Sequence, residues 1–202
     1  MPRKKVPGLP SGQPDTAGKS AAPVYRLKIS LDDSKPPIWR RVEVKDCDLE
    51  TLHGIIQAVM PWSSYHLWVF FVNRDEEYGP ASDEFEPIGE PAHTAFLSQF
   101  VARGLKKIRY NYDFGDSWDH TVTFEKTIPA EAGVAYPRCT AGVRACPPED
   151  CGGIGGYYRL LEILADPNHP EHKVMLEWTG GPIDPEAFDL AATDAALAPF
   201  RA

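Results

Sequence analysis

Apolar and polar side chains alternate along residues 24–31 and again along residues 38–44. Successive side chains on a β-strand point to opposite faces, so this alternation predicts two strands that each bury one face. Residues 66–72 contain a continuous run of six apolar residues and are expected to form a more deeply buried strand. Residues 107–113 and 118–127 alternate once more around a short turn, which predicts a hairpin.

Helices are predicted where apolar residues recur every three or four positions. The clearest is residues 49–60, where Asp48 is placed to cap the first turn and Pro61 ends the helix. The Asp-Pro pair at residues 184–185 has the form of an N-cap and a first helical residue, so the last helix is expected to run from there to about Leu197. Shorter helices are expected at residues 94–101, 156–165 and 171–177.

Together these elements predict one α+β domain, a mostly antiparallel sheet with helices packed against it. The domain is expected to span residues 23–202, because residues 1–22 are rich in Pro, Gly, Ser and charge and are expected to be a disordered tail. Residues 73–93 are acidic and irregular, which predicts an exposed excursion. Residues 128–156 are rich in Pro and Gly, but their cysteines and apolar side chains predict an ordered loop.

Composition narrows the classes of partner. The 202 residues carry a net charge of −8 and give a pI of about 5.2, which argues against nucleic-acid binding because that needs a basic surface. No apolar stretch has the length of a membrane span or the form of a signal-peptide core. We therefore expect a cytoplasmic protein with no membrane partner. The four cysteines are expected to be reduced thiols.

The hairpin between Arg109 and Glu125 concentrates candidate chemistry. Strand parity places His120 in an apolar row with Trp118, whereas Asp113 and Asp116 gather at the turn. The simplest interpretation is a buried, hydrogen-bonded histidine and ordinary turn aspartates. His66, at the start of an apolar strand, is a further candidate.

A second dense segment runs from Cys139 to Gly156. Cys139, Cys146 and Cys151 lack the paired Cys-x-x-Cys spacing of most zinc sites, so inert buried thiols are favoured over a metal site or a redox pair. Two prolines precede Glu149 and Asp150, and glycines then lead into a predicted helix. These acids are candidates either for a site or for capping that helix, whose start is also a weak candidate for anion binding.

Several segments resemble one known family. They are IWRRVEV, LHGIIQAVMPWSSYHLWVF, YNYDFGDSWDHTVTFEK, YPRCTAG, ACPPEDCGGIGGYYRLLEIL and DPEAFDL, and they extend over about residues 24–198. They are similar to the plasmid pRiA4b open-reading-frame-3-like family. The resemblance implies a bacterial or archaeal α+β domain often carried on plasmids and other mobile elements, and it brings no established activity. Neither a serine resolvase nor a LexA-type repressor fits, because the chain lacks a basic DNA-binding region, a Ser-Lys dyad and a helix-turn-helix.

Two function classes fit these residues. The first, which we favour, is a binding module that holds a protein or a small ligand. The second is a metal-assisted hydrolase, in which Asp113, Asp116, His120 and either Glu149 or Asp150 converge on a divalent metal that activates water. The candidate site residues are Asp113, Asp116, Trp118, His120, His66, Glu149 and Asp150.

The two dense segments are also expected to meet in space. Turns are where a scaffold usually displays function, and both segments form turns that carry acids and aromatics. We expect residues 113–117 to approach residues 146–153, with Tyr112 or Trp118 bridging them. The acids would then form a negative patch that selects a metal, another cationic ligand or a basic partner surface.

Overall fold

A computed structural model describes residues 22–82 and 86–201, so the predicted tail lies outside the described residues except for its last position. Within these ranges one eight-stranded sheet has the order β5-β4-β3-β6-β7-β1-β2-β8. All neighbouring strands are antiparallel except β4 and β5. The strands are β1 (Pro23–Leu31), β2 (Ile38–Lys45), β3 (Trp68–Asn73), β4 (Glu76–Gly79), β5 (Glu90–Pro91), β6 (Lys107–Tyr112), β7 (Trp118–Pro129) and β8 (Arg138–Val143).

Five α-helices and two 3-10 turns complete the described fold, which confirms the α+β prediction. The Asp48 carboxylate accepts a hydrogen bond of 2.7 Å from the Thr51 amide, as predicted for an N-cap. The helices are α1 (Leu49–Val59), α2 (Leu97–Ala102), α3 (Gly153–Ala165), α4 (His172–Trp178) and α5 (Leu190–Ala195), with 3-10 turns at Ala92–Thr94 and Ala198–Phe200.

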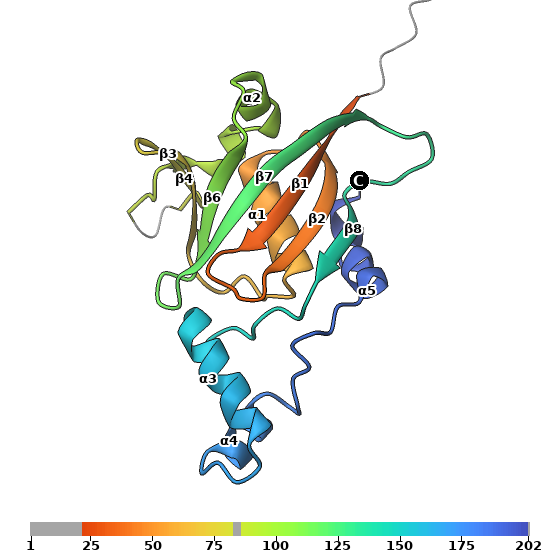
Figure 1. Ribbon diagram of the computed structural model, residues 1–202. Coiled ribbons are helices and arrows are strands. Elements are labelled where there is room, and N and C mark those ends of the chain that lie inside the picture. The colour runs from red at the N-terminus through yellow and green to blue at the C-terminus, as the bar shows by residue number, and fades with distance from the viewer. Residues whose placement is uncertain (1–21, 83–85, 202) are drawn as a thin grey trace, which may run out of the picture.

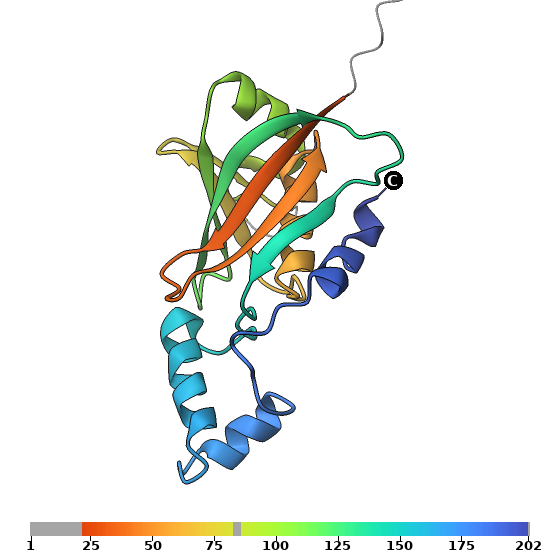
Figure 2. The ribbon, with the colours of Figure 1, turned by 45° about the vertical axis from the view of Figure 1, so that its right-hand side comes forward.

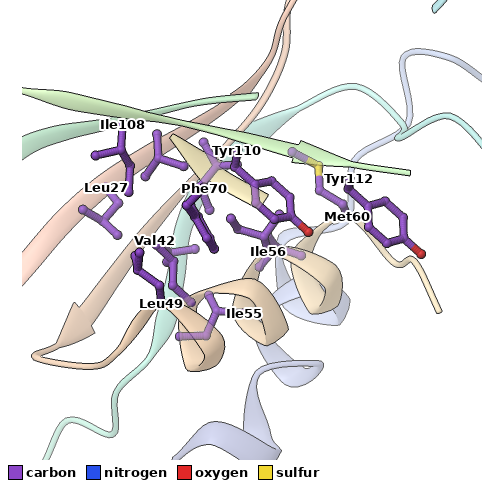
Figure 3. Packing of buried hydrophobic residues seen from close by; sticks show 14 of the residues in the cluster. Leu27, Val42, Leu49, Ile55, Ile56, Met60, Phe70, Ile108, Tyr110 and Tyr112 are labelled. Carbon is purple, nitrogen blue, oxygen red and sulfur yellow. The ribbon is translucent and has the colours of Figure 1, made fainter. Parts of the chain in front are cut away.

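The sheet curves around α1, which covers its inner face (Figures 1 and 2). The apolar stripe of α1 packs against inward-facing residues of β1, β2, β3 and β6 (Figure 3). Leu27, Ile56 and Phe70 in this core are completely shielded from solvent. The outer face of the sheet carries the polar half of each alternating strand, as the sequence pattern predicts.

The prediction for the last helix is wrong at its start. The Asp184 carboxylate accepts from the Glu186 amide and so closes a turn instead of capping a helix. The following chain is held to distant elements, because the Ala145 amide donates to the Pro185 carbonyl and Phe188 lies under the Arg40 guanidinium. The helix begins only at Leu190, where Asp189 supplies the cap.

The two stretches expected to be irregular contain short strands. Residues 73–93 include β4 and β5, and residues 128–156 include β8, which pairs with β2 at the edge of the sheet. The expected order of residues 128–156 is therefore confirmed. These strands are short or interrupted by bulges, so their alternation is too brief to show in the sequence.

One end of the sheet gathers the segments that matter for function. Both views show the β1–β2 and β6–β7 turns at this end, with α3 and α4 projecting beyond it (Figures 1 and 2). α4 has no buried residue, and its principal contacts are with α3. Helices α3 and α4 therefore project from the end of the sheet instead of covering one of its faces.

Candidate functional site

The β6–β7 hairpin has the predicted alternation. Tyr110, Tyr112, Trp118 and His120 are fully buried on the inner face. Gly115 lies in the turn but is not among its left-handed residues. Asp113 (φ 57°) and Ser117 (φ 53°) are left-handed instead, and the Asp113 Oδ1 atom accepts a 2.9 Å bond from the Gly115 amide.

His120 is a core residue, as the parity argument predicts. Its Nδ1 atom lies 2.9 Å from the Trp118 carbonyl oxygen, and burial lowers the pKa of the imidazole to about 4. Its ring packs against Trp62 and Tyr110. The hydrolase hypothesis placed His120 beside the turn carboxylates, and the structure does not bring them together.

The two dense segments meet, as predicted. The Tyr112 hydroxyl donates a 2.5 Å hydrogen bond to Glu149 Oε1, and the Gly152 amide donates a 2.9 Å bond to Asp116 Oδ2. Tyr112 is thus the bridge, whereas Trp118 is buried beneath it. The approach is close, because a Cβ atom on Gly153 (φ +66°) would lie 2.3 Å from the Asp116 carbonyl oxygen. A side chain at position 153 would force the two segments apart.

The sequence makes the start of α3 a weak candidate for anion binding, and the Asp116 carboxylate occupies that position. The amide of Gly152, the residue that caps α3, already bonds to the Asp116 carboxylate. Glu149 is held similarly, since its second oxygen accepts a 2.8 Å bond from the Ser63 amide. Both acids therefore fasten this loop to the end of the sheet, and the anion at the helix start belongs to the protein itself.

His66 is brought to the same place by strand pairing. β3 pairs with β6 so that Trp68 faces Tyr112, and the Asp113 amide donates to the Leu67 carbonyl. The His66 Nε2 atom consequently lies 3.1 Å from Asp150 Oδ1 and 3.7 Å from Asp113 Oδ2. We call His66 with the four carboxylates of Asp113, Asp116, Glu149 and Asp150 the acidic junction.

The charges of the acidic junction are unbalanced. Across residues 22–82 and 86–201, no Lys or Arg forms an ion pair with any of its four carboxylates. The Asp150 side chain is 64% exposed, whereas Asp113 is buried. Negative potential is therefore concentrated around one exposed and one shielded carboxylate.

The Trp62–Leu67 segment supplies contacts that the sequence did not single out. The Trp62 indole donates to the Pro147 carbonyl, and the Tyr65 amide donates to the Tyr112 hydroxyl. Burial, followed by the bond to the neighbouring Glu149 carboxylate, raises the Tyr112 pKa far above its ordinary value, so this hydroxyl keeps its proton. The many aromatic and polar residues of this segment were the sequence signal for a functional role. Which residues they contact depends on strand pairing, which the sequence does not show.

The cysteines do not form a site. All four are free, and the group of His66, Asp113 and Asp150 is the metal-compatible cluster found in the described part of the chain. The Cys146 thiol lies 3.7 Å from the Met60 sulfur, and the Cys139 thiol points to the Ala141 carbonyl. Burial raises the pKa of the Cys151 thiol to about 12, which disfavours the thiolate that a metal or an oxidant needs.

Comparisons with known proteins agree with this architecture. Residues 23–192 match the family model described as plasmid pRiA4b ORF-3-like protein. The chain belongs to this family. It is 41% identical over 162 residues to "Uncharacterized protein y4hQ" of Sinorhizobium fredii, covering 79% of this chain and 82% of that one.

A solved structure supports the same assignment. The crystal structure titled "Protein of Unknown Function MM3350" from Methanosarcina mazei Go1 superposes with a TM-score of 0.76 at 41% identity. The alignment covers 84% of this chain and 96% of that one. No helix in the described residues of this family member is long and apolar enough to cross a membrane.

Proposed function

We propose that this family member is a binding module and that the acidic junction is its binding site for a cationic ligand. The observation that carries this proposal is the convergence of four carboxylates that no Lys or Arg neutralises among the described residues. A surface with unbalanced negative charge attracts cations and repels phosphate groups. The same feature supports the expectation that nucleic acid is not the partner.

Three large apolar side chains that are close to the junction in sequence are exposed. Tyr65 is 81% exposed, and Leu67 and Phe114 are also exposed although all three are large and apolar. They directly adjoin His66 and Asp113 in the chain. Exposed large apolar side chains beside polar groups are typical of interaction surfaces.

A cavity beside the junction supports a small ligand. Its volume is about 370 Å³, and Asp150 and Cys151 form the side nearest the junction. The rest of the lining includes the apolar Leu160, Met175 and Trp178 of α3 and α4, together with Arg159, which is paired with Glu171. The cavity shares Asp150 with the junction. A ligand that binds the junction through a cationic group would therefore have room in the cavity for an attached apolar part.

Metal-assisted hydrolysis is a second candidate with a narrower set of residues. His66, and not His120, stands beside Asp113 and Asp150, and Asp150 is open to solvent. A metal held by three protein ligands keeps positions for water and substrate. Hydrolysis of a phosphodiester or ester by the metal-loaded protein, lost in His66→Gln, would support this candidate.

The binding module also fits a cytoplasmic protein of plasmid or mobile-element origin. The name of the matching family refers to a plasmid reading frame, and this supports the origin. The four cysteines are free thiols, which is compatible with a reducing compartment.

Spermidine, a flexible organic trication, tests the proposed function. Titrated into the full chain, it should shift the backbone amide resonances of Gly115 and Gly152 and saturate with one site. Glu50→Gln, which removes an exposed acid at the far end of α1, serves as the matched control and should leave the titration unchanged. Shifts spread over all acidic surfaces without saturation would refute a defined cation site.

A further inference from the structure

We propose that the acidic junction binds a divalent transition-metal ion through His66 Nε2, Asp113 Oδ2 and Asp150 Oδ1. The inference rests on the proposed function and identifies the cation. The three side chains come from three separate segments: the loop before β3, the β6–β7 turn and the loop before α3. Each can offer one ligand atom, and these atoms all lie within 4.8 Å of one another.

The distances fit a shared ion. Zinc binds imidazole nitrogen and carboxylate oxygen at about 2.0–2.2 Å, so tetrahedral geometry places ligand atoms roughly 3.3–3.6 Å apart. The His66 Nε2 atom lies 3.1 Å from Asp150 Oδ1 and 3.7 Å from Asp113 Oδ2. The ligand atoms of Asp113 and Asp150 lie within 4.8 Å of each other, so rotation of these side chains would bring the three atoms onto one ion.

The His66 nitrogen is an independent sign of a ligand. Nε2 is shielded from solvent and has no hydrogen-bond partner, although Asp150 Oδ1 is only 3.1 Å away. The contact is therefore close in distance but unsuited in direction to a hydrogen bond. A shielded polar atom without a partner costs free energy, and a metal ion between the three groups would satisfy it.

The conformation of Asp113 also suits a metal ligand. The residue is buried and its backbone is left-handed, which turns its side chain out of the strand alternation. Oδ1 accepts from the Gly115 amide, and Oδ2 is left facing His66. One oxygen orients the carboxylate while the other is available as a ligand.

Tyr112 acts as a positioning residue for both sides of this site. Its ring meets the His66 ring edge to face at 5.7 Å between centroids. Its hydroxyl accepts from the Tyr65 amide and donates to Glu149, the neighbours of His66 and Asp150 in the chain. A single phenol thus fixes the two loops that carry ligands, which is the role of an outer-layer partner in metal sites.

The donor set selects the class of metal. Imidazole suits zinc, iron and copper, and carboxylates suit manganese and iron as well as zinc. Magnesium and calcium prefer sites made of oxygen atoms alone. Because Asp150 is largely exposed, the ion would keep positions open toward solvent.

Manganese is the most informative probe. Mn²⁺ favours oxygen and imidazole over thiolate, so the four free cysteines do not confuse the measurement as they would with Zn²⁺. After dialysis against a chelator, the full chain should bind one Mn²⁺ by calorimetry and Mg²⁺ at least tenfold more weakly. The paramagnetic ion should broaden the amide resonances of Gly115 and Gly152 before others, and this measurement needs no variant.

Substitutions identify the ligands. His66→Gln and Asp113→Asn should each weaken Mn²⁺ binding at least tenfold. The double variant Glu50→Gln/His93→Gln is a matched control, because these residues form a histidine–carboxylate pair at 4.0 Å without a second acid. It should change the affinity less than twofold.

The outcomes separate this inference from the proposed function. If Mn²⁺ does not bind, or broadens resonances elsewhere, while spermidine still binds at the junction, the metal assignment fails and the cation-binding module stands. If neither binds, both fail. Equal Mn²⁺ affinity in His66→Gln and Asp113→Asn, with folding verified by circular dichroism, would also overturn the assignment.

Discussion

Carboxylates on the outer face of the sheet are paired with arginines, whereas those at the acidic junction are not. On the sheet, Glu43 is 1% exposed between Arg26 and Arg138, each with a nitrogen 2.7 Å from one of its oxygens. Burial alone would raise the Glu43 pKa, but the bonds from both arginines lower it on balance. Glu125 is likewise paired with Arg41.

The junction holds its acids without any such pairing in the described residues. Glu149 and Asp116 bond to neutral donors, a phenol and backbone amides, which orient a carboxylate without cancelling its charge. Among the basic side chains of the described residues, Asp113 and Asp150 pair only with His66. The difference is one of neutralisation: arginines cancel the charge of these acids on the sheet, whereas the junction keeps an excess of negative charge among the described residues.

Lowering the pH should have the largest effect on stability. The effect should come from histidines buried in the core beneath the sheet. Burial lowers the pKa of His53 and of His120 from 6.5 to about 4. Between these pH values the unfolded chain binds more protons, so the free energy of unfolding falls as the pH drops from about 6.5 to about 4. The upper bound is on the order of 3 kcal/mol for each histidine, since one pKa unit corresponds to about 1.4 kcal/mol.

Urea unfolding at pH 7, 5.5 and 4.5 measures this loss. His120→Gln keeps a polar side chain that does not titrate and should remove roughly half of the pH dependence in this window. A stability that stays constant from pH 7 to pH 4.5 would contradict the buried neutral imidazoles.

Removing a paired acid should be the next largest effect. Glu43→Ala leaves two arginines side by side, but both side chains are partly exposed and can turn to solvent. We therefore expect a loss of about 2–3 kcal/mol in the free energy of unfolding, below the 3–5 kcal/mol typical of fully buried pairs. Mn²⁺ affinity should not change, and a change would break the proposed separation of the two regions.

Much of the fold could be predicted from local sequence, because strand alternation and helix signals are local. The buried faces of β6 and β7, the Asp48 cap and the position of His120 all follow from such patterns. The start of α5 could not be predicted, because the chain before it bonds to residues far away in sequence. At these residues tertiary contacts override the local helix propensity.

The site was predictable only in part for the same reason. The meeting of the two segments through Tyr112 was expected from their composition, and the structure confirms it. Placing His66 beside Asp113 needs the pairing of β3 with β6, which sequence alternation cannot give. The left-handed backbone at Asp113 also ends the strand parity that separated its side chain from the inner face.

Within the junction, the fastening acids should differ from the exposed one. Glu149→Ala removes bonds to the Tyr112 hydroxyl and the Ser63 amide, so we expect a loss of about 1–2 kcal/mol in unfolding free energy. Tyr112→Phe should lose about 1 kcal/mol, and the double variant should lose less than the sum because the two share a bond. The cycle is measured by urea unfolding, and strict additivity would show that this bond does not join the loop to the sheet.

Tyr112→Phe also tests positioning against simple stability. If the phenol holds the His66 and Asp150 loops in place, the variant should bind Mn²⁺ several-fold more weakly at a temperature where it is fully folded. Restoring stability with an osmolyte should not restore the affinity. An unchanged affinity would confine Tyr112 to a structural role.

The smallest expected effect concerns Asp150, and its sign is the informative part. Its side chain is 64% exposed and lies in a group of like charges, so Asp150→Asn should raise the free energy of unfolding by about 0.5 kcal/mol or less without metal. The gain should shrink in 0.5 M NaCl, because salt screens repulsion between exposed charges. With Mn²⁺ in excess the order should reverse, since binding stabilises the folded chain by an amount that grows with the logarithm of affinity and the variant lacks a ligand atom. Thermal melting of both proteins with and without Mn²⁺ measures the reversal, with Glu50→Gln as the control for removal of an exposed acid. A variant that is less stable under every condition would place Asp150 among the fastening acids, and the contrast between the junction and the sheet would then be one of degree.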